Sequence, residues 1–230
     1  AVGRFKDAKD RTSWRIRLAT MEFDFGKAQS RDEHKALVET VREWAGKEVQ
    51  PQIHDLDRAH RFNRDFLKGM AELSLLGICI PEEWGGAGMD YLSLGLACEE
   101  LEYVDTHLRV IMSVHVGLNS MTLWCWGSEA QKKKYLVPQA KGEKIATYGP
   151  TDPNAGSDAV GIQTTAVRKG DRYVLNGEKV WISLADVADH FLVIAWTDLE
   201  KKKARDHSGL SAFIVERAFP GFSSYTIKEK

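Results

Sequence analysis

The hydrophobic positions in the first two thirds of the chain recur at helical spacing. Residues 31–49 place their apolar side chains on one stripe with charges opposite, and residues 62–73 form a second stripe. Residues 91–103 predict another helix, and the nearly all-apolar residues 106–124 predict a fourth. Together these segments predict a bundle of antiparallel helices joined by short loops.

The apolar helix expected at residues 106–124 is close to the length of a membrane span. Arg109 and His115 interrupt it, and ionisable groups are costly inside lipid. We therefore predict a central buried helix and no membrane span. Beyond it, Ser128 and Gln131 have the spacing of a capping box, which indicates the start of a further short helix.

Short apolar runs between turn residues replace the helical stripes from about Ala146. We expect strands at residues 163–168, 172–175, 178–182, 191–197 and 211–216, with another beginning at 221. Asn176-Gly177 suits a tight turn with positive φ and predicts a hairpin between the second and third strands. The charged residues 198–208 are expected to form an exposed hairpin loop. The expected fold class is α+β: a helical bundle, then an antiparallel β-barrel or sandwich.

Composition narrows the function classes. The 230 residues are 43% hydrophobic, so the chain can bury a real core, and the net charge of −1 gives no basic field for nucleic acid. Three widely spaced cysteines form no C-x-x-C pair, which favours buried thiols in a reducing compartment. The histidines show no metal-ligand spacing, so we expect no metal site.

Two polar features stand close together in the β region. The turn at residues 151–158 is rich in hydroxyls and carboxylates. The expected strand at residues 178–182 ends in Trp181-Ile182-Ser183, and strand alternation would place Trp181 and Ser183 on one face. Such a pair of features suits a flat heteroaromatic cofactor. The residues alone equally allow a β-hairpin with a core tryptophan.

The ordered motifs in this region resemble the acyl-CoA dehydrogenase family. They are T-D-P-N-A-G-S-D at residues 151–158 and G-D-x-Y-V-L-N-G-x-K-x-W-I-S at residues 170–183. The resemblance extends upstream through P-E-E-W-G-G-A-G and G-S-E-A-Q-K. It implies an N-terminal helical domain at 21–146 and an incomplete middle β domain at 147–230. Residues 1–20 carry many basic and few apolar positions with no continuous apolar run, so we expect a poorly ordered leader or an upstream extension there.

The resemblance also implies the chemistry. Family members use FAD to remove hydrogen from the α and β carbons of an acyl-CoA thioester and pass electrons to an electron-transfer flavoprotein. For this chain we expect a short-chain or dicarboxylic acyl-CoA. The resemblance also implies that the full-length protein is a homo-oligomer. We expect it in the cytoplasm, or in the mitochondrial matrix if the source is eukaryotic. An oxygen-using oxidase-like offshoot and a catalytically inactive flavin- or CoA-binding assembly module are the alternatives.

Each motif residue then has an implied role. Thr151 and Ser183 would hydrogen-bond the flavin ring. At the position of Ser183 the family usually has threonine, which also carries a hydroxyl. Tyr148, Trp181 and Ile182 would form its walls. Pro150 and Gly156 belong to the turn whose backbone contacts the cofactor, and Ser157 would face the CoA.

Arg109 lies in a stretch that resembles the glutaryl-CoA dehydrogenase branch, where an arginine binds the distal carboxylate of the substrate. The alternative is a structural ion pair with Asp105 or Glu102. The family's catalytic glutamate lies in a C-terminal helical domain that has no counterpart here, so no residue of this chain is predicted as the catalytic base. We expect a fragment of a larger subunit that binds FAD weakly and has no turnover alone.

Overall fold

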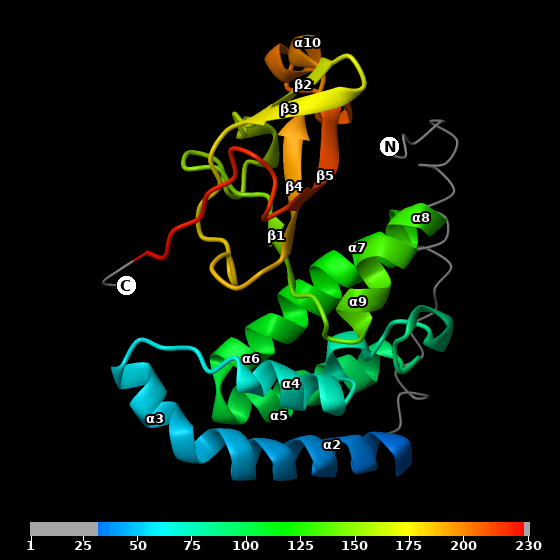
Figure 1. Cartoon of the computed structure of the whole chain (residues 1–230), viewed down its shortest axis with the longest axis vertical. Coiled ribbons are helices and arrows are strands. Elements are labelled where there is room, and N and C mark those ends of the chain that lie inside the picture. Colours follow the sequence, from blue (N-terminus) through cyan, green and yellow to red (C-terminus); the bar gives the residue numbers. More distant parts are fainter. Residues whose placement is uncertain (1–31, 228–230) are drawn as a thin grey trace.

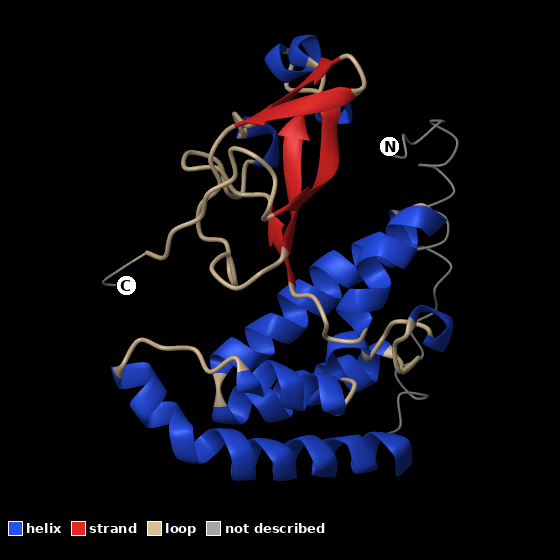
Figure 2. Cartoon of the chain, viewed as in Figure 1, coloured by secondary structure: helices blue, strands red, loops and turns tan. Residues whose placement is uncertain are grey.

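The computed structural model describes residues 32–227. The helices up to α9 form one body, and the strands with α10 form a second body above it, with β1 leading from one into the other (Figures 1 and 2). This arrangement confirms the expected α+β class. The leader expected at residues 1–20 lies outside the described residues.

The helical body agrees with the apolar stripes of the sequence. Its main elements are α2 (Asp32–Trp44), η1 (Ala45–Val49), α3 (Gln50–Arg58), α4 (Asp65–Glu72), α5 (Tyr91–Val104), α6 (Thr106–Ile111), η4 (Met112–Ser120), α7 (Met121–Trp126), α8 (Glu129–Gln131), η5 (Lys132–Leu136) and α9 (Val137–Ala140). Short 3₁₀ turns, η2 (Leu75–Gly77) and η3 (Glu82–Trp84), follow α4. α2 packs along α5, and Arg42 donates to both carboxylate oxygens of Glu100 at 2.6 and 2.8 Å.

The apolar segment at residues 106–124 is the central helix of this body. α6, η4 and α7 follow one another without a break, and the middle part is wound as a π-helix (Figure 1). Leu108, Ile111 and Val116 are fully buried along it. No helix among the described residues is both long and apolar enough to cross a membrane.

The capping box at Ser128 is also confirmed. The Ser128 hydroxyl accepts from the Gln131 N–H, and the Gln131 side chain accepts from the Ser128 N–H. These two bonds satisfy donors that the first turn of α8 would otherwise leave without partners. They set the start of the short helices that lead to the first strand.

β4 is the centre of the sheet. The strands are β1 (Ala146–Gly149), β2 (Thr165–Lys169), β3 (Arg172–Asn176), β4 (His190–Trp196) and β5 (Leu210–Glu216). β4 runs parallel to β1 and to the start of β2, and antiparallel to β5, while β2 and β3 form a hairpin. The described strands therefore form an open mixed sheet, whereas an antiparallel barrel or sandwich was the expected form.

The predicted hairpin at Asn176-Gly177 is wrong. The chain turns instead at Gly170, whose φ is 63°, and β2 pairs with β3 across that turn. Residues 177–183 are not a strand. A Cβ on Gly177 would lie 2.7 Å from the Cα of Thr164, so this glycine serves close backbone packing and not a tight turn.

Two other expectations in the β region need correction. Residues 198–208 are exposed in part as expected, but they contain helix α10 (Leu199–Lys203) and the 3₁₀ turn η7 (His207–Gly209). Asp198 caps α10 by accepting from the N–H groups of residues 200 and 201, a signal hidden within the charged run. Residues 221–227 form no strand.

Candidate functional site

The polar turn after β1 is organised by one buried carboxylate. Asp152 exchanges backbone hydrogen bonds with Ala155, each 3.1 Å long, which closes the turn. Its side chain, 4% exposed, accepts from the N–H groups of Gln163 at 2.6 Å and Thr164 at 2.8 Å. The Thr164 hydroxyl donates to it as well, at 2.9 Å. Asp152 thus joins the turn to the start of β2.

The segment that carries Trp181 lies directly against this turn. The Val180 N–H donates to the Thr151 carbonyl at 3.0 Å. The Lys179 ammonium donates to the Pro150 carbonyl at 3.0 Å and pairs with Asp152 at 2.5 Å. The structure therefore brings the two sequence motifs together, although the second is an irregular segment and not the strand end that was expected.

The ends of this segment show how the predicted site residues are presented. Trp181 is 64% exposed and has a φ of 58°, so the indole is not the core residue that a plain hairpin would need. This conformation also replaces the strand alternation that was expected to put Trp181 and Ser183 on one face. The Ser183 carbonyl accepts from the Thr147 hydroxyl at 2.5 Å, which ties the segment to β1.

Several polar groups of the site make no hydrogen bond to any other described residue. Among the described residues, the hydroxyls of Thr151, Ser157 and Ser183 have no hydrogen-bond partner, and Ser157 and Ser183 are exposed. Tyr148 and Ile182 are half-buried, and burial raises the pKa of the Tyr148 phenol. The uncommitted hydroxyls of Thr151 and Ser183 lie on the two bonded segments, one of which carries the exposed indole, and such groups fit a flat polar ring that takes hydrogen bonds at its edge.

Gly156 and Pro150 complete the turn. A Cβ at Gly156 would meet only the Thr151 methyl, at 3.9 Å, so the backbone there is open. The Pro150 carbonyl is occupied by Lys179. The Pro150 carbonyl is therefore not available to a ligand, while the space at Gly156 is open.

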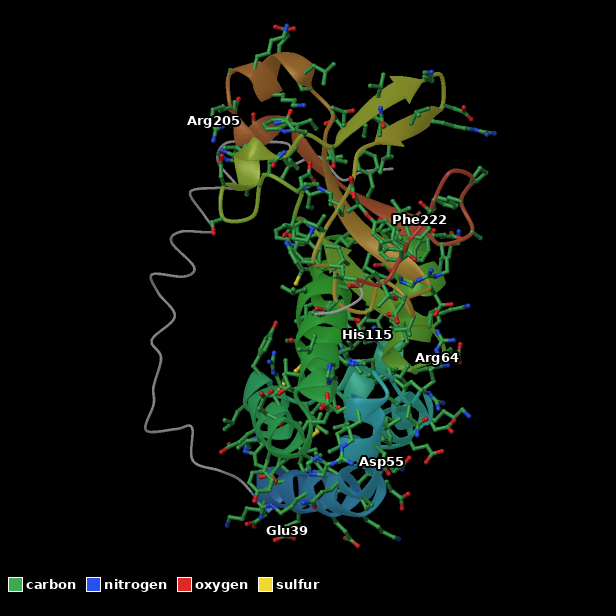
Figure 3. All side chains as sticks on the ribbon, turned by 90° about the vertical axis from the view of Figure 1, so that its left-hand side faces the viewer. Glu39, Asp55, Arg64, His115, Arg205 and Phe222 are labelled. Carbon is green, nitrogen blue, oxygen red and sulfur yellow. The ribbon has the colours of Figure 1, made fainter. Side chains whose placement is uncertain are left out.

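A buried polar network supports β1 from below. The Asn119 amide donates to the Thr147 carbonyl at 2.7 Å, and His115 accepts from the Ala146 N–H at 3.0 Å. Figure 3 shows His115 between the lower helices and the sheet. Gln139 links Asn119 to His190, bonding both side chains.

The two histidines of this network are held neutral. Burial lowers the pKa of His115 to about 4, although hydrogen bonds with the backbone at Gln139 and Ala146 oppose the shift. Burial, together with the neighbouring His115, lowers the pKa of His190 to about 4. From the sequence, His115 served only as an argument against a membrane-spanning helix. Its place in an otherwise apolar helix was the available signal for a buried polar contact.

Arg109 lies in α6 and pairs with Glu102, with its Nε 2.6 Å from the carboxylate. Hydrogen bonds from Arg109 and then Thr106 lower the pKa of Glu102. The ion pair weighed as the alternative to substrate binding is thus present. Arg109 remains 35% exposed at its side chain, so it is still accessible from solvent. No group of three or more metal-ligating side chains is found in residues 32–227.

Comparison with known proteins places both halves of the chain. Residues 31–143 match the model of the acyl-CoA dehydrogenase N-terminal domain, and residues 147–230 match that of the middle domain. A short-chain specific acyl-CoA dehydrogenase of Clostridium acetobutylicum is 43% identical over 198 residues, which cover 86% of this chain and 51% of the relative.

Two solved structures are similar in fold and sequence. A chain from the structure of an electron transferring flavoprotein of Acidaminococcus fermentans has a TM-score of 0.83 and 40% identity, covering 88% of this chain and 52% of that one. A glutaryl-CoA dehydrogenase of Mycobacterium smegmatis in complex with FADH2 has a TM-score of 0.81 and 31% identity, covering 90% and 51%. The chain therefore spans about half the length of the proteins it matches.

Proposed function

The chain belongs to the acyl-CoA dehydrogenase family, and we propose that it forms the FAD- and acyl-CoA-binding part of a larger subunit that dehydrogenates acyl-CoA thioesters. The observation that carries this proposal is the junction of the 150–152 turn with residues 179–183. That junction presents an exposed indole beside uncommitted hydroxyls. The family's enzymes are flavin-dependent oxidoreductases, and these residues fit the cofactor's ring and polar edge.

The side chains have distinct tasks in this proposal. The Thr151 and Ser183 hydroxyls would hold the edge of the isoalloxazine ring, while Tyr148, Trp181 and Ile182 would enclose its faces and exclude water. Ser157 would hold the CoA side of the substrate. When bound, the flavin supplies the acceptor for the hydride that leaves the β carbon. The base that takes the α-proton is assigned to no residue of this chain.

The first experiment measures FAD binding by the purified chain, from the quenching of flavin fluorescence. Thr151→Ala and Ser183→Ala each remove one hydrogen bond to the ring edge and should weaken binding by roughly fivefold, or about 1 kcal/mol. Thr40→Ala is the control, because that hydroxyl donates only to the Ala36 carbonyl within α2. Equal affinities for all three variants would reject the assigned hydroxyls.

We propose a short-chain acyl-CoA as the substrate, in line with the Clostridium relative. A dicarboxylic substrate is the second candidate, because Arg109 is partly exposed and a similar structure is a glutaryl-CoA dehydrogenase. Arg109→Ala should then weaken glutaryl-CoA binding roughly tenfold and leave butyryl-CoA binding unchanged, as measured by titration calorimetry. Arg42→Ala, which breaks another Arg–Glu pair, is the control. Equal losses for both thioesters would reject the dicarboxylic assignment.

The partners follow from the same proposal. An electron-transfer flavoprotein would receive the electrons, consistent with the Acidaminococcus structure, and the whole subunit would form a homo-oligomer in the cytoplasm or mitochondrial matrix. Steady peroxide formation by the whole subunit in air would instead favour the oxidase-like alternative. A colourless chain that takes up no FAD would favour the assembly module.

A further inference from the structure

The Asp152–Lys179 ion pair is the most deeply buried of the described Lys–carboxylate pairs. Their side chains are 4% and 12% exposed, and the charged atoms are 2.5 Å apart. Burial raises the pKa of Asp152, but hydrogen bonds from Lys179, Thr164 and Gln163 outweigh it and leave that pKa lowered. Burial lowers the pKa of Lys179, and Asp152 opposes this. Each residue therefore offsets part of the cost of burying the other's charge.

The contacts of the pair connect the two halves of the proposed flavin site. Lys179 reaches the Pro150 carbonyl and the Asp152 carboxylate, which flank Thr151 on either side. The next residue, Val180, bonds the Thr151 carbonyl itself. Three successive residues of the turn are thus held by two successive residues of the other segment.

We infer that Lys179 and Asp152 are positioning residues that set the distance between the Thr151 and Ser183 hydroxyls, and so the affinity for the flavin ring. This inference rests on the proposed function. Neither side chain needs to touch the cofactor, because Lys179 acts through the 150–152 backbone and Asp152 through its bonds to Lys179 and the start of β2. Hydrogen bonds to a ring edge depend steeply on distance and angle, so a small displacement of the turn is enough to weaken them.

The test compares Lys179→Met with the double variant Asp152→Asn/Lys179→Met. The single variant leaves the buried Asp152 carboxylate without its cationic partner, so it should lose both stability and FAD affinity. The double variant removes both charges and should regain most of the stability in urea unfolding, while FAD affinity stays roughly tenfold or more below wild type. Recovery of both properties would mean that the pair acts through stability alone and would overturn the inference.

Lys144→Met is the matched control. Lys144 pairs with Asp189 at 2.9 Å, so this variant also removes a lysine from an Asp–Lys pair. Among the described residues that pair makes no hydrogen bond to the turn, and it is more exposed. It should leave FAD affinity within roughly twofold of wild type. A loss equal to that of Lys179→Met would show that any broken ion pair in the β region has the same effect, and would also overturn the inference.

Amide hydrogen exchange without FAD gives a second, flavin-independent readout. In Lys179→Met the N–H of Val180 should exchange faster, while β4 keeps its wild-type protection. Uniform acceleration across the sheet, or no change at Val180, would reject the positioning role whatever the binding data show. If wild type takes up no FAD, the proposed function fails, and exchange at Val180 alone decides whether the pair holds the two segments together.

Discussion

The helical body and the β region supply very different shares of the apolar core. The main cluster takes most of its buried side chains from the helical body and extends to Ala188 and Phe191 of the β region, while a second, smaller cluster comprises Ala155, Ile162 and Trp196. Where the two bodies meet, hydrogen bonds accompany this apolar packing: His115 and Asn119 bond β1, and Gln139 contacts His190. Apolar packing thus forms the helical body and continues into the sheet, and the buried hydrogen bonds add direction to the contact between them.

Further polar ties lie at the rim of this junction. Lys134 and Tyr135 each donate to Glu216 at the end of β5, at 2.7 Å. Hydrogen bonds from Lys134 and Tyr135 lower the pKa of Glu216. Arg64 donates to the Val187 carbonyl at 3.0 Å, close to the residues that follow Ser183. Because such bonds depend on direction, this junction fixes how β1 and the candidate site face the helices.

The largest effect should come from a cavity in the helical core. Leu101 in α5 is fully buried, so Leu101→Ala should lower the free energy of unfolding by about 2–5 kcal/mol. Ile162→Ala in the smaller cluster should cost less, at or below about 2 kcal/mol, because fewer buried neighbours surround it. Urea unfolding measures both. Leu118→Ala, at a 45% exposed position, is the control. A larger loss for Ile162→Ala would contradict the contrast between the two regions.

The polar junction should make stability depend on pH. His115 has a folded pKa of about 4 against an ordinary 6.5, so the unfolded chain binds its proton first as pH falls. Its contribution is fully present above pH 6.5 and is lost between 6.5 and about 4. Going from about pH 7.5 to about pH 5 should therefore cost about 2 kcal/mol for this histidine.

The measurement is urea unfolding at the two pH values. In His115→Gln the loss of unfolding free energy between the two pH values should be smaller, because the contribution of His115 is removed. The contribution of His190, whose pKa is also lowered, should remain. His54→Gln, at an exposed position in α3, is the control and should keep the wild-type slope. An unchanged slope in His115→Gln would show that the junction histidines do not govern this pH dependence.

The sequence predicted the helical body well because helical spacing and burial coincide there. The stripe through Val41, the central helix and the Ser128 cap all appear where expected. The motifs also predicted that the turn and the Trp181 segment come together, which they do through the Thr151–Val180 bond. The sheet was harder, because β1 pairs with β4 across a long stretch of chain that local patterns cannot register. The buried network at Gln139 and His190 was missed for the same reason.

The two glycines at the ends of β3, Gly170 and Gly177, give the sharpest local test, and Gly170 gives the smallest expected effect. Gly177→Ala would place a Cβ 2.7 Å from the Thr164 Cα and Cβ, so it should cost about 1–3 kcal/mol through overpacking. Gly170→Ala meets nothing within 4 Å but is strained at a φ of 63°, so about 1 kcal/mol is expected. Gly170→Asn is the control, because asparagine tolerates positive φ, and it should cost less than Gly170→Ala.

Thermal or urea unfolding ranks the variants. Had the chain turned at Asn176-Gly177, the strain at Gly170 would be absent, so the same cost for Gly170→Ala and Gly170→Asn would count against the turn described here. Because Gly177 precedes Lys179 by two residues and abuts Thr164, Gly177→Ala should also weaken FAD binding, whereas Gly170→Ala, at the far end of the β2–β3 hairpin, should not.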